Sequence, residues 1–194
     1  MNRLEKDEKL KKIEKKFLKN FREDSLFVQG ENPVFGEGSS LAKIMFIGEA
    51  PGRNEALSSR PFCGRAGKIL DEALELINLK RKDIYIANIL KLRPPGNRNP
   101  KPEEIERHAP YLGLQINAIK PKIICTLGNF STAYIFAKYG LKDKIQGISK
   151  IHGKIFRKNK ITIIPFYHPA VVAYNPNMKD IIKKDFLILE KIEQ

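Results

Sequence analysis

A short apolar run that stops in a cluster of turn residues constrains this chain most. Residues 44–47 are Ile-Met-Phe-Ile, and they are followed at once by Gly48, Glu49, Ala50, Pro51 and Gly52. This pattern predicts a buried strand that ends in a tight turn with an exposed backbone. In an open α/β sheet, ligands bind outside the carboxyl ends of the strands, so we expect residues 48–50 to face a pocket.

A second turn follows directly and holds an aromatic residue between proline and glycine, which break regular secondary structure. Residues 61–67 read Pro-Phe-Cys-Gly-Arg-Ala-Gly, and Phe62 is not where a core phenylalanine usually sits. A flat ligand fits such a turn. Many nucleotide-binding loops are also rich in glycine, but this one lacks both the GxGxxG spacing and the lysine of a P-loop.

Strand-like runs alternate with helix-like periodicity along the rest of the chain. This alternation predicts an α/β fold, a three-layer α/β/α sandwich around a mostly parallel central sheet with right-handed crossovers. The expected strands are 42–47, 83–90, 122–127 and 161–167, and the expected helices are 68–79, 102–119, 129–139 and 178–192.

We expect residues 1–194 to form a single domain, because no linker-like composition divides them. Residues 1–33 are predicted to be a helical extension and loop packed on that domain. Leu10, Ile13, Phe17 and Phe21 recur there at helical spacing, which indicates one apolar stripe.

The formal net charge is +14 and the sequence pI is about 9.7, which favours a polyanionic partner such as nucleic acid. A lysine-rich composition with solvated charged faces is the alternative explanation. The sequence shows neither a membrane-length apolar run nor a signal peptide, so we expect a cytoplasmic protein with no membrane partner.

Three expected strands end in polar residues with chemical potential. Glu49, Asn88 and His168 each follow an apolar run, so a parallel sheet would gather them at one edge. An amide at the end of an apolar strand needs a partner, which is either structural or a ligand. A histidine in such a place is more often structural, but its coincidence with the other two favours a site.

The loop after Asn88 is stiff and basic. Residues 91–100 contain three prolines and three cations, and Arg93 and Arg98 are placed to reach phosphates. A solvated loop would have a similar composition.

Four motifs together resemble those of the family 4 uracil-DNA glycosylases: GEAPG at 48–52, RPFCGRAG at 60–67, NILKLRPPGNRNP at 88–100 and HPA at 168–170. The resemblance covers roughly residues 34–190 and keeps the order and spacing of the motifs. It implies a monofunctional DNA repair glycosylase that flips uracil out of DNA, hydrolyses its N-glycosidic bond and leaves an abasic site. Other deaminated bases are further candidate substrates.

The resemblance also implies roles for individual residues. Phe62 would stack on the base, Asn88 would read its N3 and O4 edge, and His168 would donate to O2. Glu49 would act on the attacking water or the cationic sugar, with Glu55 as the alternative carboxylate. The remaining implied contacts are Gly48 and Ala50 to the base, Arg93, Asn97 and Arg98 to DNA, and Val171, Val172 and Tyr174 as the minor-groove wedge.

The chain also departs from the family pattern. Ala56, Ser59, His152 and Tyr174 replace the usual residues and are candidates for a changed substrate range or DNA grip. The family's four iron–sulfur cysteines are missing: two would fall in residues 20–27, and Leu92 and His108 occupy the other positions. Because the chain has only two cysteines, Cys63 and Cys125, we expect neither a metal site nor an iron–sulfur cluster, and the apolar N-terminal stripe would pack there instead.

Two functions remain in contention at this point. One is an active glycosylase, and the alternative is a catalytically weak superfamily member that mainly binds DNA or abasic sites. A small-molecule nucleotide-binding protein is a third reading, but it makes no use of the basic loop. We expect a monomer whose partner is DNA containing uracil or another deaminated base.

Overall fold

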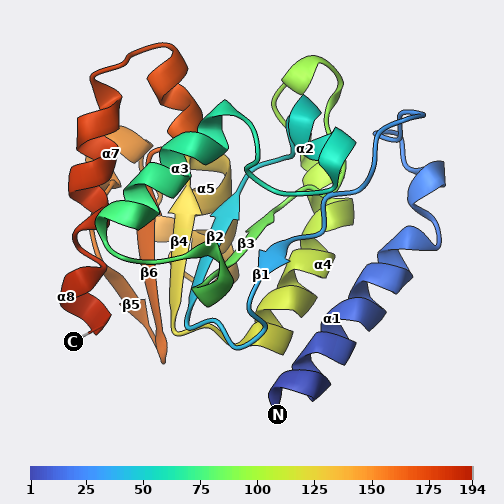
Figure 1. Ribbon diagram of the computed structural model, residues 1–194, viewed down its shortest axis with the longest axis horizontal. Helices are drawn as coiled ribbons and strands as arrows, with labels where there is room; N and C mark the ends of the chain where they lie inside the picture. The colour runs from blue at the N-terminus through green and yellow to red at the C-terminus, as the bar shows by residue number, and fades with distance from the viewer. Residues whose placement is uncertain (194) are drawn as a thin grey trace.

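A mixed six-stranded sheet forms the centre of the protein in the computed structural model, which describes residues 1–193 (Figure 1). The strand order is β1-β3-β2-β4-β6-β5, and the four inner strands are parallel to one another. The antiparallel edges are β1 and β5. The strands are β1 (Glu37–Gly38), β2 (Ile44–Gly48), β3 (Tyr85–Asn88), β4 (Ile123–Leu127), β5 (Phe156–Lys158) and β6 (Ile161–Phe166).

Helices cover both faces of the sheet, because each inner strand is apolar on both sides. In β2, Met45 and Ile47 join one core cluster, whereas Ile44 and Phe46 join the other. The first cluster is covered by α1 (Arg3–Leu18), α4 (Pro102–Ile119), α5 (Asn129–Lys138) and α6 (Ile148–Ile151), and the second by α3 (Arg65–Leu76) and α7 (Met178–Phe186). This arrangement confirms the three-layer α/β/α fold predicted from the sequence.

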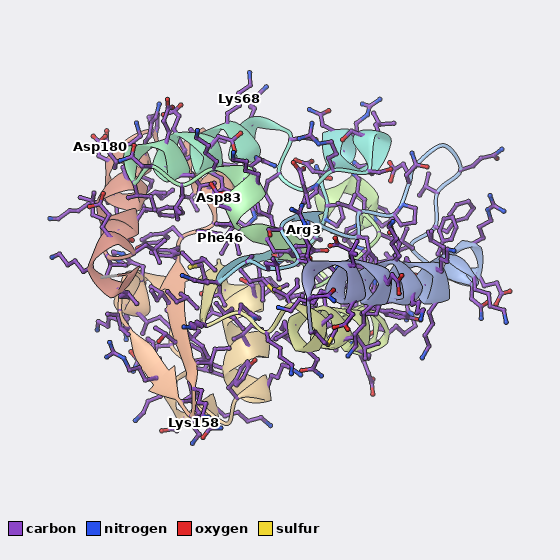
Figure 2. The ribbon with its side chains drawn as sticks, turned by 60° about the horizontal axis from the view of Figure 1, so that its bottom comes forward. Arg3, Phe46, Lys68, Asp83, Lys158 and Asp180 are labelled. Carbon is purple, nitrogen blue, oxygen red and sulfur yellow. The ribbon has the colours of Figure 1, made fainter. Side chains whose placement is uncertain are left out.

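Charged side chains project outward from this core. In Figure 2, Phe46 lies between the layers, whereas Lys68 and Lys158 lie at the periphery. None of the helices between residues 1 and 193 is long and apolar enough to cross a membrane.

Several short elements differ from the expected boundaries. Helix α3 begins at Arg65, inside the second glycine turn, and α2 (Arg53–Ser58) was not expected at all. The expected C-terminal helix is divided into α7 and α8 (Glu190–Glu193). The edge strands β1 and β5 were missed because strands of two and three residues are too short to show an alternating pattern. The last residue of the expected domain, Gln194, lies outside the described residues.

The N-terminal helix α1 packs against α4. A capping box formed by Asn2 and Glu5 starts α1, and the Lys6 Nζ donates to the Ile119 carbonyl at 2.6 Å. The ring of Phe17 meets the rings of His108 and Tyr111 edge-on, with centroid distances of 5.3 and 5.0 Å. Phe17 also belongs to the same buried cluster as Leu92. The N-terminal segment therefore shares the core of the sheet.

We predict that Phe17→Ala destabilises the fold, because Phe17 is only 5% exposed. A large buried aromatic replaced by alanine loses about 3–5 kcal/mol of unfolding free energy. Urea unfolding followed by circular dichroism measures this loss. Leu4→Ala on the same helix is the matched control, because Leu4 is 75% exposed. Equal unfolding midpoints for the two variants would contradict the packing of α1.

Candidate functional site

A pocket of about 330 Å³ lies at the carboxyl edge of β2, β3 and β6. Glu49 follows β2, Asn88 ends β3, and His168 begins the short 3-10 helix η5 (Pro169–Ala173) after β6. The parallel register pairs Gly48 with Asn88, so the two strands end at the same level. Predicted residues that line the pocket are Glu49, Ala50, Glu55, Phe62, Asn88, Asn97, Arg98, His168 and Tyr174.

The side chain of Asn88 is the clearest sign of a ligand. It is 1% exposed, and its Oδ1 has no hydrogen-bond partner among residues 1–193. A buried acceptor left unpaired costs about 1–3 kcal/mol, so native proteins rarely keep one without a reason. A donor supplied by a bound molecule would satisfy this oxygen.

Gly48 makes room for the two groups that flank it. A Cβ at this position would lie 2.3 Å from the Asn88 Oδ1 and 2.7 Å from the Phe62 Cζ. Both contacts are shorter than any that real Cβ atoms make. Gly48 is absent from the pocket lining, but its missing side chain leaves the space beside it that the Asn88 amide and the Phe62 ring occupy.

A buried lysine fixes the backbone of Asn88 from the interior. The Nζ of Lys91 donates to the Asn88 carbonyl and to the Gln115 Oε1, both at 2.7 Å. Gln115 in turn donates to the Phe35 carbonyl at 2.8 Å. Lys91 is fully buried, and this burial lowers its pKa to about 7. Sequence reasoning placed Lys91 in a basic loop, although a lysine next to an apolar strand was a signal of burial.

Phe62 lies on one wall of the pocket in an unusual backbone conformation. Its φ is +51°, in the left-handed region that large side chains rarely adopt. Its ring centroid is 5.5 Å from that of His168, and the two rings are tilted by 32°. Two flat side chains therefore border the cavity in front of Asn88.

His168 is held in one tautomer. Its Nδ1 accepts a hydrogen bond from the Ala170 N–H at 3.2 Å, so the neutral ring carries its proton on Nε2. Burial lowers the pKa of His168 to about 4, against an opposing effect of Glu55. Near neutral pH the imidazole is thus uncharged and offers one N–H donor.

The two carboxylates of the site have different surroundings. Glu55 is 9% exposed, and its Oε1 accepts from the Gly64 N–H at 2.9 Å, which ties α2 to the second glycine turn. Glu49 is half-buried directly after β2, and burial raises its pKa. Glu55 therefore has a structural partner, and Glu49 is the carboxylate placed at the sheet edge.

The basic loop borders the mouth of the pocket, and its arginines carry carboxylate partners. Arg98 forms two bonds to Glu104, with N–O distances of 2.9 and 2.5 Å. Arg93 lies outside the lining, where it donates to Glu31 at 2.5 Å and to Asn97 at 2.7 Å. These hydrogen bonds fix the orientation of both guanidinium groups.

The wedge residues lie on the other side of the mouth. Tyr174 is 90% exposed, while Val171 and Val172 are partly buried against the second core cluster and do not line the pocket. Val172 instead borders a neighbouring hollow together with Arg65 and Lys68.

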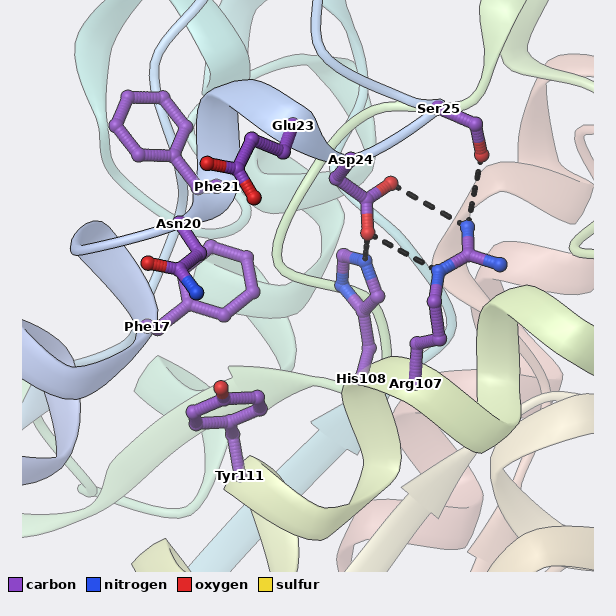
Figure 3. Close-up of a pocket in the computed structure, with 9 residues that line it drawn as sticks. All are labelled: Phe17, Asn20, Phe21, Glu23, Asp24, Ser25, Arg107, His108 and Tyr111. Atoms are coloured by element: carbon purple, nitrogen blue, oxygen red, sulfur yellow. Dashed lines mark hydrogen bonds and ion pairs between the residues drawn. The ribbon is translucent and has the colours of Figure 1, made fainter.

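A second hollow lies between α1 and α4, where the resemblance would place a cluster (Figure 3). His108 Nε2 contacts the Asp24 carboxylate at 3.1 Å, and His108 Nδ1 accepts from the Lys91 N–H at 2.9 Å. Arg107 bonds to Asp24 and Ser25. Sequence reasoning did not single out Asp24, because nothing in its local sequence predicts a partner 84 residues away.

Neither cysteine lies at this second hollow. Cys63 Sγ is 3.1 Å from Ser58 Oγ beside the pocket, and Cys125 is fully buried in β4. Within residues 1–193, no group of three or more His, Cys, Asp or Glu side chains could hold a metal ion. The donors present at the hollow, one imidazole and one carboxylate bonded to each other, do not suit an iron–sulfur cluster, which takes thiolates.

The fold and the pocket define an α/β protein with a candidate ligand pocket at the carboxyl edge of a parallel sheet. Comparison with known families makes this class specific. Residues 35–188 match the sequence profile of the uracil DNA glycosylase superfamily. The chain therefore belongs to the uracil-DNA glycosylase superfamily.

Individual relatives agree with this placement. The chain is 47% identical over 161 residues to a type-4 uracil-DNA glycosylase of Saccharolobus solfataricus, covering 80% of this chain and 74% of that protein. It is 45% identical over 159 residues to that of Archaeoglobus fulgidus, covering 80% and 79%. A similar protein of Thermotoga maritima is 36% identical over 192 residues, covering 96% and 93%.

We predict that His168 titrates at about pH 4, because burial disfavours the imidazolium. An NMR titration that follows the chemical shift of the His168 Cε1 proton measures this midpoint. A range of about pH 3 to 8 spans the ordinary histidine pKa values. The chain has three histidines, so His168→Gln assigns the signal by its loss. A midpoint near an ordinary histidine value of about 6.5 would contradict this account of the site.

Proposed function

We propose that this protein is a DNA repair glycosylase that hydrolyses the N-glycosidic bond of uracil in DNA and leaves an abasic site. The observation that carries the proposal is the buried Asn88, which lines a pocket together with Phe62 and His168 and whose Oδ1 has no hydrogen-bond partner within residues 1–193. The type-4 uracil-DNA glycosylases named above support it. The pocket is enclosed by protein side chains at the sheet edge, so a base must leave the stacked DNA to enter it.

Asn88 selects the base by the pattern of donors and acceptors. Its Oδ1 accepts the N3–H of uracil, and its Nδ2 donates to O4. Cytosine presents an acceptor at N3 and a donor at its amino group, which is the reverse pattern. With the amide in the orientation that matches uracil, cytosine leaves buried polar groups unpaired. Phe62 stacks on the flat face of the base.

His168 and Glu49 act on the bond that breaks. The bond between N1 of uracil and C1′ of the sugar breaks, and its electron pair leaves with the base, on which negative charge develops. The oxygen of a water molecule joins C1′ and loses one proton, which balances the proton that the uracil anion takes up from the solvent. The Nε2–H of His168 donates to uracil O2 as that charge grows, which stabilises the transition state. Glu49 orients the water and stabilises the cationic sugar, while Glu55 keeps its bond to Gly64.

DNA is gripped at the two sides of the mouth. Arg93, Asn97 and Arg98 approach phosphates from the stiff loop, and the phosphates compete with Glu31 and Glu104 for the guanidinium groups. On the opposite side, Val171, Val172 and Tyr174 fill the gap left by the flipped base, with the exposed Tyr174 at the tip. The net charge of +14 strengthens association with any DNA.

The N-terminal region holds together without an iron–sulfur cluster in this proposal. Burial of Ile13 and Phe17, together with the hydrogen bond between Asp24 and His108, ties residues 1–33 to α4. The chain then acts as one domain. Its expected monomeric state and cytoplasmic location stay predictions.

Uracil excision and its selectivity test the proposal directly. We expect the protein to release uracil, and not cytosine, from otherwise identical oligonucleotides, with thymine and hypoxanthine included to define the range. Asn88→Asp lowers the single-turnover rate on uracil on the order of 10²-fold, because an ionised carboxylate cannot donate to O4. Alkali cleavage of the abasic product measures the rate.

Asn78→Asp is the matched control for charge, because Asn78 is exposed at the end of α3. It should keep the parent rate. Absence of cleavage on every substrate, together with retained DNA binding, would replace the enzyme by the alternative, a protein that mainly binds DNA or abasic sites.

Metal analysis tests the N-terminal part of the proposal. Anaerobically purified protein should contain negligible iron. It should also lack the broad visible absorption of an iron–sulfur cluster at roughly 400 nm. Adding iron and sulfide under reducing conditions should not change this result, because the hollow offers no thiolate. Stoichiometric iron with acid-labile sulfide would overturn it.

A further inference from the structure

The backbone of Phe62 needs an external restraint. Its φ of +51° places a bulky side chain in the left-handed region. Such a residue is strained by about 1–3 kcal/mol and keeps this conformation only where its surroundings enforce it. The turn itself is short and glycine-rich, so the restraint has to come from another element.

Arg81 supplies that restraint from the 3-10 helix η2 (Arg81–Asp83). Its NH1 donates to the Pro61 carbonyl at 3.0 Å, and its NH2 donates to the Phe62 carbonyl. One planar guanidinium thus holds two consecutive carbonyls from two separate nitrogens, a rigid fork that a lysine ammonium lacks because all its donors lie on one nitrogen. The Arg81 side chain is only 18% exposed, which limits competition from water.

Arg81 is itself anchored on its other side. Its Nε donates to the Asp71 carboxylate of α3 at 2.6 Å, and its NH1 lies 3.6 Å from the Glu37 carboxylate of β1. Gly67 closes the arrangement, because a Cβ there would lie 1.7 Å from the Phe62 oxygen. The Phe62 carbonyl is therefore confined between Arg81 and the first turn of α3.

We infer that Arg81 is a positioning residue for base stacking: it holds the Phe62 peptide in the strained conformation that presents the ring to the flipped base. The inference rests on the proposed stacking role of Phe62. Arg81 does not line the pocket, so its effect on excision passes through Phe62. A displacement of about 1 Å at a reacting centre can slow a reaction on the order of 10²-fold.

A double-mutant cycle between Arg81 and Phe62 separates positioning from general stability. Single-turnover rates on uracil-containing DNA are measured at saturating enzyme for Arg81→Ala, Phe62→Ala and the double variant. Arg81→Ala should slow excision about 10- to 100-fold in the parent. In the Phe62→Ala background the same change should slow it less than about 2-fold, because no ring remains to be positioned.

Arg60→Ala is the matched control. Arg60 also pairs with Glu37, through hydrogen bonds of 3.1 and 2.9 Å. Both of these bonds go to Glu37 and neither goes to the Phe62 carbonyl. It should keep the parent rate. Arg81→Lys retains the charge and keeps the cycle informative if Arg81→Ala does not fold. It should lose rate as well, since an ammonium lacks the rigid fork of the guanidinium, and a crystal structure of it should show a changed φ at Phe62.

The outcomes distinguish this inference from the proposed function. A parent rate for Phe62→Ala would refute the stacking role. A slow Phe62→Ala, with Arg81→Ala either unchanged from the parent or equally harmful in both backgrounds, would refute positioning by Arg81 and leave the proposed function intact.

Discussion

Parallel pairing of the inner strands is the constraint on which the rest of the structure depends. Because β3, β2, β4 and β6 run in the same direction, their carboxyl ends meet along one edge. The register that pairs Gly48 with Asn88 brings a residue without a side chain beside a buried amide. Glu49, Asn88 and His168 are then presented from strand ends or the turns that follow them, whereas α2 contributes Glu55 and the loops add the rim.

The sequence predicts the strand ends well and their supports poorly. Glu49, Asn88 and His168 follow apolar runs, and that local pattern was enough to bring them to one edge. The roles of Lys91 and Arg81 were missed because the groups they hold at the pocket are backbone carbonyls, which carry no sequence signal. Asp24 was missed because its partner is distant in the chain. The short edge strands were missed because neither is long enough to show a period.

The site is built at the expense of stability, which the two core clusters must offset. An unpaired amide oxygen, a fully buried lysine and a phenylalanine at positive φ are each unfavourable in an isolated fold. Their concentration at one edge is typical of a functional site. Three side chains brace the walls of the pocket: Lys91, Arg81 and Glu55 each bind a backbone group of the turns and strands that form these walls.

Lys91 is shared by the pocket and the N-terminal hollow. Its ammonium holds the Asn88 carbonyl, while its backbone N–H donates to His108, whose other nitrogen contacts Asp24. Three hydrogen bonds therefore connect the segment after α1 to Asn88, the amide that we propose reads the base. A fusion partner or affinity tag that strains the amino terminus would consequently disturb the position of Asn88 and the base selection proposed for it. A tag attached after α8 would not act through these hydrogen bonds.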